Sequence, residues 1–445
     1  MGPSRSSLRF IGIACGVLLL VGACTRGSPG SPSSTALPAS SAPASNDVSE
    51  VTEPETRATT TTSAVASVDP TEIIVWADEA RANVLEDFAA SFKDATGVVV
   101  QVVDVAFESI LEEFLLVGST AGAPDIIMGA SSWAGTLADR DLAMAIDLGG
   151  RIDEFSPESV ASFSIDGQLY AIPYAVETLA VYFNAALVSG VPATMGELAT
   201  ICADLGGVAG CLGLPGGGTV GDVYHHSPFL TLHGGGVFEY VAATGYVASE
   251  VKLDSSETID GIESLEGLIE QGLIGSVDVD EARARFHAGE VPYWLTGPWE
   301  LGPLGDTNLD WGVGSIPEVD GAVPRPFVGG QGFYVNAHSE HPVIAQAFLI
   351  DFVATDESMQ ALFRADPRTP AYRTTARAVA ADGVQSVFAQ MAAIGVPFPN
   401  VPEMDVVWQP LADRLLAVRN GELDAASAMA EAQDLVEAAL AAGTS

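Results

Sequence analysis

Short apolar runs alternate with amphipathic patterns from residue 72 onward. Residues 72–76, 98–105 and 123–128 are rich in β-branched side chains and predict buried strands. Residues 83–96 and 107–116 carry apolar side chains at helical spacing and predict helices. Strands that alternate with helices predict βαβ units and a largely parallel sheet.

A long extended stretch follows at residues 170–184, with no turn signal inside it. It predicts a strand that leaves one lobe and enters another. We therefore expect an α/β protein with two discontinuous lobes joined by crossing strands. The first lobe would hold residues 71–178 plus 327–372, and the second lobe residues 179–326 plus 373–445. Ligands of such folds bind in the cleft between the lobes, near the carboxyl ends of strands.

The N-terminus has the charged-then-apolar order of an export signal. Arg5 and Arg9 precede an apolar stretch at 10–21, which is shorter than the roughly 20 residues that a membrane-spanning helix needs. The small residues before Cys24 resemble the lipobox of bacterial lipoproteins. We expect the signal peptide, 1–23, to be removed and Cys24 to carry a lipid that anchors the protein to the outer face of the cell membrane. The alternative is an ordinary signal peptide that contains a cysteine.

Residues 24–70 continue from this cysteine in Ser, Thr, Pro and Ala with scattered acids. The segment has no apolar periodicity, so it predicts a disordered tether. A flexible chain of this length has an r.m.s. reach on the order of 40 Å. Such a tether would hold a folded domain away from the membrane and still keep it near.

The formal net charge of the chain is −40. Binding to a polyanion needs basic clusters, so this charge excludes nucleic acid as a natural partner. The acids are spread along the chain, which is typical of solvated faces.

Two further cysteines, Cys202 and Cys211, flank a Gly-rich turn. In an oxidising exterior they predict a local disulfide, and the alternative is two buried thiols. His225 and His226 are adjacent, so their side chains point in different directions and form a poor metal pair. The sequence indicates no metal site and no cofactor.

Seven short segments occur in a set order: 74–76, 122–127, 170–184, 223–235, 286–290 with 296–299, 326–330, and 399–404 with Trp408. With these segments in this order, the chain resembles, across residues 72–445, the maltose-binding type of solute-binding protein. Proteins of this type serve ATP-binding-cassette (ABC) sugar importers. The resemblance implies a periplasmic-binding-protein-like fold whose two lobes close over a small-molecule ligand, here an oligosaccharide. It also implies a monomer that delivers its ligand to membrane permease subunits.

Three aromatic residues match the positions at which the relatives stack rings on sugar. They are Trp299 in a Gly-Pro-Trp turn, Trp408, and Tyr224. A sugar presents apolar C–H faces to such rings, and its hydroxyl edges bind carboxylates, amides and Arg. The alternative for each aromatic is a place in the core.

Four polar residues complete the predicted site. Glu177 lies inside the apolar crossing stretch, where a buried acid without partners is costly. Binding ligand hydroxyls removes that cost, and a structural bridge between the lobes is the alternative. Asp222 replaces a ligand-binding glutamate of the relatives, and Arg81 replaces a lysine. Asp78 belongs to the same loop after the first strand.

The third strand is followed by a departure from the family pattern. Residues 129–133 lack the Asp and Arg of the relatives, while Ser132 keeps a hydroxyl and Trp133 an aromatic ring for the ligand. Several hydroxyl contacts of a maltose site are therefore missing, and the identity of the sugar stays open.

Two other classes of function remain as alternatives. The same fold could bind a polyamine, a ferric ion or a peptide, because acids are plentiful. A secreted glycoside hydrolase would need paired carboxylates in one cleft, and only Glu177 is placed there. We therefore expect a binding protein and not an enzyme.

Overall fold

The computed structural model of the chain describes residues 71–443 apart from 208, 242–244, 276 and 382. These residues belong to one compact unit, 67–445. The predicted signal peptide, Cys24 and the whole of the predicted tether lie outside the described residues. Among the described residues, no helix has both the length and the apolarity that crossing a membrane requires.

The first sheet has the strand order β14-β6-β13-β3-β1-β2, and β15 pairs with β13. β1 pairs with β2 and β3 in parallel, as predicted, but β13 runs antiparallel to both β3 and β6. The expectation of a largely parallel sheet is therefore wrong. The reason is that β13 returns from the other half of the chain and enters the sheet from the opposite direction. The strands are β1 (Glu72–Ala77), β2 (Val99–Asp104), β3 (Ile126–Ala130), β6 (Ala171–Glu177), β13 (Phe327–Val335), β14 (Thr369–Pro370) and β15 (Val396–Pro397).

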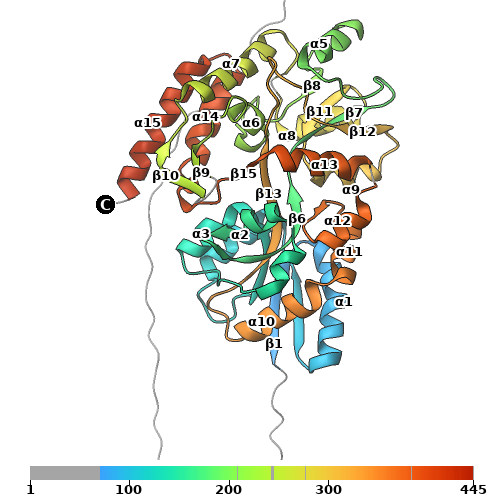
Figure 1. The fold of residues 1–445 in the computed structure, drawn as a ribbon, viewed down its shortest axis with the longest axis vertical. Helices are drawn as coiled ribbons and strands as arrows, with labels where there is room; N and C mark the ends of the chain where they lie inside the picture. Colours follow the sequence, from blue (N-terminus) through green and yellow to red (C-terminus); the bar gives the residue numbers. More distant parts are fainter. Residues whose placement is uncertain (1–70, 208, 242–244, 276, 382, 444–445) are drawn as a thin grey trace, which may run out of the picture. The chain divides into compact units, whose positions relative to one another are not determined.

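A second, smaller sheet has the order β12-β7-β11-β8. β7 continues the chain almost directly from β6, so one extended stretch contributes to both sheets, as the uninterrupted pattern at 170–184 predicts (Figure 1). The strands are β7 (Ala180–Asn184), β8 (Leu212–Gly213), β11 (Tyr293–Thr296) and β12 (Trp311–Gly314). Two short hairpins stand outside these sheets: β4 (Ser164–Ile165) with β5 (Gln168–Leu169), and β9 (Phe238–Val241) with β10 (Gly245–Val251).

The buried apolar side chains form two separate cores. One core contains the first sheet and runs from Ile73 to Val176 and from Val328 to Tyr372, with Ala392. The other runs from Leu179 to Phe327 and includes the C-terminal helices. Because the division falls at the crossing between β6 and β7, the α/β class with two packed regions is confirmed. The finer lobe boundaries stay a prediction.

Helices surround both sheets (Figure 1). Around the first sheet, α1 packs on β2 and α11, and α2 packs on β3. These helices are α1 (Glu79–Thr96), α2 (Phe107–Val117), α3 (Ala134–Asp139), α4 (Pro157–Ser162), α10 (Pro342–Phe348), α11 (Asp356–Ala365) and α12 (Arg373–Val379).

In the other half, α6 packs on α7, and α14 packs on α15. The helices are α5 (Met195–Asp204), α6 (Val223–Leu230), α7 (Ser256–Glu270), α8 (Val279–His287), α9 (Leu301–Gly305), α13 (Gly383–Ile394), α14 (Trp408–Arg419) and α15 (Ala425–Gly443).

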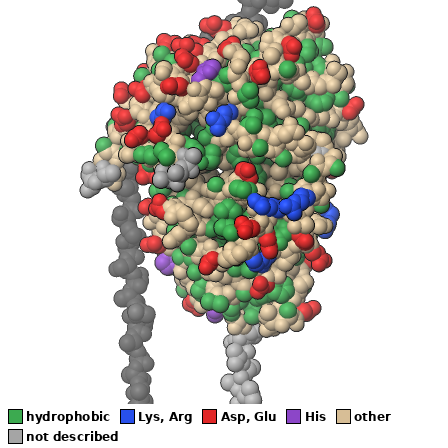
Figure 2. Space-filling model, in the orientation of Figure 1, with side chains coloured by type: hydrophobic (Ala, Val, Ile, Leu, Met, Phe, Trp, Pro, Cys, Tyr) green, Lys and Arg blue, Asp and Glu red, His purple; other side chains and the backbone are tan. Residues whose placement is uncertain are grey.

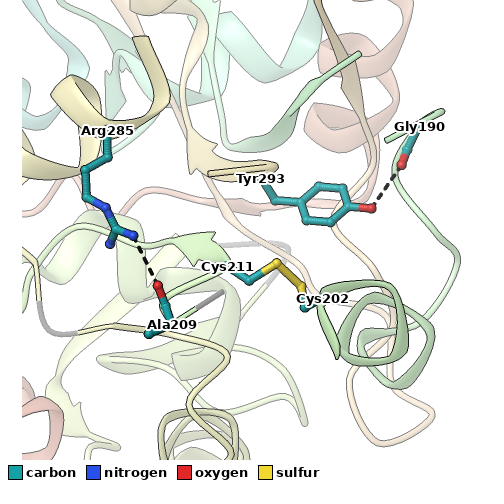
Figure 3. Close-up of a disulfide and its surroundings, with 6 residues drawn as sticks. All are labelled: Gly190, Cys202, Ala209, Cys211, Arg285 and Tyr293. Atoms are coloured by element: carbon teal, nitrogen blue, oxygen red, sulfur yellow. Dashed lines mark hydrogen bonds between the residues drawn. A yellow bond between two sulfur atoms is a disulfide. The ribbon is translucent and has the colours of Figure 1, made fainter. Parts of the chain in front are cut away.

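A disulfide joins Cys202, near the end of α5, to Cys211, just before β8 (Figure 3). The two Cα atoms are 6.0 Å apart, and nine positions separate the residues in the sequence. The Arg285 guanidinium donates to the Ala209 carbonyl at 3.1 Å in the same loop. The disulfide therefore closes this loop, and the Arg285 guanidinium and the Gly272 carbonyl bind the residues just before Cys211.

Close packing between β13 and β6 depends on glycine at position 330. A Cβ atom there would lie 2.5 Å from the Ala175 carbonyl oxygen, closer than any relaxed contact. We predict that Gly330→Ala lowers the free energy of unfolding by about 1–3 kcal/mol, the usual cost of overpacking.

Urea unfolding of Gly330→Ala tests this, with Gly267→Ala in α7 as the matched control. A Cβ at Gly267 meets no atom within 4 Å, and alanine is the better helix former, so the control should be as stable as the parent or more stable. Equal stability of the two variants would contradict the packing argument.

Candidate functional site

Three of the predicted site aromatics lie in one cluster. The Tyr224 ring centroid is 5.9 Å from that of Trp299 and 6.3 Å from that of Phe398. Phe398 in turn stacks on Trp408 at 5.5 Å with an interplanar angle of 18°. The four rings come from four separate segments, so only the tertiary structure assembles them. All but Phe398 are partly exposed.

Trp299 is held in place by its own turn. Pro298 and Trp299 form a short 3-10 helix, Pro298–Glu300, directly after β11. The indole lies over Gly297, where a Cβ would come within 2.1 Å of the ring. The Gly297 carbonyl accepts a hydrogen bond from the Tyr182 hydroxyl at 2.8 Å. The Gly-Pro-Trp pattern therefore has a steric reason, because only glycine leaves room for this ring.

Asp222 is engaged within α6. Its Oδ1 accepts a hydrogen bond from the His225 backbone N–H at 2.9 Å and caps the helix, and its Oδ2 lies 2.6 Å from His225 Nδ1. The His225 ring meets the Trp299 ring edge to face, with centroids 5.7 Å apart. Asp222 thus supports the aromatic cluster through His225. Its predicted contact with a ligand stays a prediction.

His225 and His226 have different partners, as their adjacency predicts. His225 Nε2 lies 3.4 Å from Thr296 Oγ1, whereas His226 contacts the Asp222 carbonyl and the Arg419 guanidinium. Burial, and then the charge of Arg419, lower the pKa of His226 to about 3, so this imidazole is neutral in the folded protein.

A buried network of charges contains the other predicted polar residues. Arg368 pairs with both Glu177 and Asp366, and Arg81 pairs with Asp366 at 3.0 Å and with Asp78 at 2.8 Å. Every side chain in this network is at most 17% exposed. Each carboxylate therefore has a guanidinium partner.

The pKa values within this network follow from burial and pairing. Burial raises the pKa of Asp78, and the charge of Arg81 opposes that shift without cancelling it. Burial alone would lower the pKa of Arg368, but the charges of Glu177 and Asp366 raise it above its ordinary value. Arg368 therefore stays positively charged.

The contacts of Trp133 and the position of Ser132 are in a part of the structure other than the aromatic cluster. Trp133 stacks on Phe107 at 5.2 Å and covers Gly129. Ser132 is partly buried in the same 3-10 turn, while its neighbour Ser131 accepts a hydrogen bond from the Gly330 N–H at 3.0 Å. Their contact with a ligand stays a prediction.

Sequence reasoning missed Arg368, Asp366, Gln331 and Phe398. Gln331 donates from Nε2 to Glu177 Oε2 at 3.3 Å. A sequence signal for two of them exists: Asp366 and Arg368 carry opposite charges in an Asp-Pro-Arg pattern just before the short strand β14. Gln331 and Phe398 sit in apolar surroundings and gave no separate signal.

A cavity of about 400 Å³ lies at the amino end of β1, the opposite end of that strand from Asp78. Its lining includes Glu72, Asp125 and Ser339. On the face drawn in Figure 2, acidic side chains are scattered over the surface, as expected for solvated acids.

Residues 87–387 match a protein family described as bacterial extracellular solute-binding protein. The matched range begins inside α1 and ends inside α13, and so includes strands of both sheets.

Several relatives are similar over most of the chain. The galactooligosaccharide-binding protein of Bacillus subtilis (strain 168) is 23% identical over 386 residues, covering 84% of this chain and 90% of that protein. The maltodextrin-binding protein MdxE of the same organism is 24% identical over 359 residues, covering 77% and 84%. A maltooligosaccharide ABC transporter solute-binding lipoprotein of Streptococcus pneumoniae (strain ATCC BAA-255 / R6) is 24% identical over 377 residues, covering 82% and 88%.

The Asp222–His225 pair predicts a pH effect on stability. Burial alone would raise the pKa of Asp222, but the charge and hydrogen bonds of His225 outweigh burial and lower it below its ordinary value. A carboxyl with a lowered folded-state pKa contributes stability above its unfolded pKa of about 3.9, and this contribution is lost as the pH falls further. Asp222→Asn keeps a capping oxygen but removes the charge.

We predict that Asp222→Asn melts below the parent at pH 7 and that the difference shrinks at pH 3. Thermal unfolding of both proteins at the two pH values measures this. A difference of the same size at both values would show that the Asp222 charge adds nothing to the fold.

Proposed function

The chain belongs to the family of bacterial extracellular solute-binding proteins, and from this premise we propose that it captures an oligosaccharide and delivers it to an ABC importer. The resemblance expected from the seven sequence segments is confirmed by the family match. The family and the relatives are binding proteins, and the relatives are named for galacto- and malto-oligosaccharides.

The observation that carries the proposal is the aromatic cluster of Trp299, Tyr224 and Trp408. Three partly exposed rings brought together from distant segments offer apolar faces of the size of a sugar ring. Pyranose C–H faces stack on such rings, and the sugar hydroxyls then need polar partners at the edge of the stack. Glu177, with its partner Arg368, supplies polar groups beside this cluster, since Glu177 pairs with Gly329 and a Cβ at Gly329 would lie 4.0 Å from Phe398 Cβ.

The charge balance favours a neutral ligand over a polyamine or a ferric ion. Glu177, Asp366 and Asp78 each pair with an arginine, so each carboxylate of the described network already has a cationic partner. A cationic ligand would have to displace Arg368 or Arg81 from buried ion pairs, which leaves a buried charge without its partner. A glycoside hydrolase is also disfavoured, because Glu177 is bound to Arg368 and is not placed against a second free carboxylate.

The proposed mechanism is closure of the two lobes about the crossing strands. Trp299 and Tyr224 belong to the second core, and Glu177 ends a strand of the first sheet. A ligand that contacts both sides binds the closed state more tightly than the open state, and this difference shifts the population toward closure. The closed protein would then be recognised by the permease subunits of the importer.

We further propose that Cys24 carries a lipid and that residues 24–70 tether the binding domain to the outer face of the membrane. The support is the order of charged, apolar and small residues before Cys24, and a relative that is named a lipoprotein. With a signal of this order, the cysteine becomes the new N-terminus after cleavage.

Trp299→Ala tests the sugar site. We predict that a screen of residues 71–445 by thermal shift finds stabilisation by an oligosaccharide and none by spermidine or ferric ion. Removing a central aromatic contact should then weaken that sugar by about 30-fold or more, as expected for the loss of some 2 kcal/mol.

The matched control is Trp311→Ala, because Trp311 contacts Tyr182 at 5.8 Å in the second core and is not part of the cluster. It should lower the melting temperature and leave the dissociation constant unchanged. Stabilisation by spermidine alone would overturn the sugar proposal and keep the family.

Cys24→Ser tests the anchor. We predict that the full-length variant leaves the membrane fraction and lacks the mass of a lipid, whereas Cys15→Ser, which changes the signal only, stays anchored. Membrane fractionation with mass spectrometry of the N-terminal peptide measures both. A lipidated Cys24→Ser protein would contradict this assignment.

A further inference from the structure

Gln331 is a buried amide at the centre of the first sheet. It lies in β13, opposite Ala130 of β3 and Ala175 of β6, and is 3% exposed. A buried amide is costly unless both its N–H and its carbonyl groups are hydrogen-bonded. Nε2 donates to Glu177, but Oε1 is buried and has no hydrogen-bond partner within the part of the chain that the structure describes.

The orientation of this amide follows from its neighbour. A carboxylate paired with arginine only accepts hydrogen bonds, so the amide must turn its N–H₂ group toward Glu177. Its carbonyl oxygen then faces away from Glu177 as an acceptor that lacks a donor. The polar atom of Gln331 without a partner among the described residues is therefore its carbonyl oxygen, which can accept a hydrogen bond from a ligand.

Tyr224 has a second buried polar atom of this kind. Its hydroxyl oxygen is buried and lacks a hydrogen-bond partner among the described residues. Burial raises the pKa of Tyr224, the charges of Glu177 and Asp222 raise it further, and Arg368 opposes them. The phenol therefore keeps its proton. Its ring centroid lies 6.3 Å from that of Phe398.

These two atoms come from segments of different cores that meet near Glu177, because Gly329 of β13 lies beside Phe398 and pairs with Glu177 of β6. Tyr224 comes from α6, which packs in the second core, and Gln331 from β13 of the first sheet. Glu177 is already paired with Arg368. The two buried atoms without partners among the described residues are an uncharged acceptor, Gln331 Oε1, and an uncharged donor, the Tyr224 hydroxyl. Such a pair fits a group that both donates and accepts, which is a hydroxyl.

We propose that Gln331 is a specificity-determining residue of the ligand site, where its Oε1 accepts a hydrogen bond from a ligand hydroxyl while the Tyr224 hydroxyl donates to a ligand oxygen. This inference rests on the proposed function and deepens it. The ligand class is a neutral polyol, and a deoxy analogue that lacks this hydroxyl is rejected because it leaves the buried amide unsatisfied.

Glu177 itself is a poor test of this proposal. Its removal would leave Arg368 buried with one partner fewer and would damage the fold as well as the site. Gln331→Met is better, because methionine has nearly the same length and no amide. Tyr224→Phe is a second variant that removes a single oxygen atom.

The experiment titrates maltotriose, a galactotriose and spermidine into the parent and both variants by calorimetry. We expect one sugar to bind the parent and to bind each variant roughly three- to tenfold more weakly, as the loss of one neutral hydrogen bond implies. Without sugar, Gln331→Met should melt somewhat below the parent, because Glu177 Oε2 loses the amide that donates to it. Tyr224→Phe should melt near the parent, because the hydroxyl that it removes has no partner among the described residues.

Gln433→Met is the matched control. Gln433 is another buried amide, in α15, but both of its ends bind protein: Oε1 accepts from the Leu253 N–H at 2.9 Å and Nε2 donates to the Val251 carbonyl at 3.2 Å. Its replacement should lower the melting temperature and leave sugar affinity unchanged.

The outcomes separate the two proposals. If a sugar binds the parent, and Gln331→Met and Tyr224→Phe bind it equally well, the role of Gln331 is overturned and the proposed function stands. If the parent binds spermidine and neither sugar, the proposed function falls and the role of Gln331 falls with it.

Discussion

The chain first crosses from the first sheet to the second through two residues, Thr178 and Leu179, and both are buried. The Thr178 hydroxyl donates to the Phe327 carbonyl at 3.0 Å, which ties this crossing to the strand that returns. Glu177 and Gln331 meet because these two strands are held side by side. In the closure that we propose, this crossing is one of the connections between the two cores at which the chain would bend.

The local charge at this junction differs from the charge of the whole protein. The chain as a whole is strongly acidic, but three buried carboxylates and two guanidinium groups alternate beside the crossing. Such pairs add little stability compared with apolar side chains, yet breaking one leaves a costly unpaired charge. Their consequence is a buried group of fixed, paired charges beside the crossing.

The aromatic part of the site could be predicted from sequence because its signals are local. Gly297 and Pro298 set the position of Trp299 within three residues. Asp222 shows where local signals become ambiguous, since an acid before a helix is favoured both as a cap and as a ligand contact. In the structure the cap and His225 occupy both of its carboxylate oxygens. The amino-acid sequence alone does not show which of the two roles engages the carboxylate oxygens of Asp222.

By itself the sequence determined the α/β class, the crossing stretch and the family, because periodicity and short motifs act over a few residues. It also named three aromatic residues that the structure brings together, Trp299, Tyr224 and Trp408, but not their partner Phe398. Only the tertiary structure decided the antiparallel entry of β13 and the partners of Glu177. Gln331 is 154 positions and Arg368 is 191 positions away from that residue. Contacts over such distances depend on strand register and on the return path of the chain, and both are set by how two cores pack against shared strands.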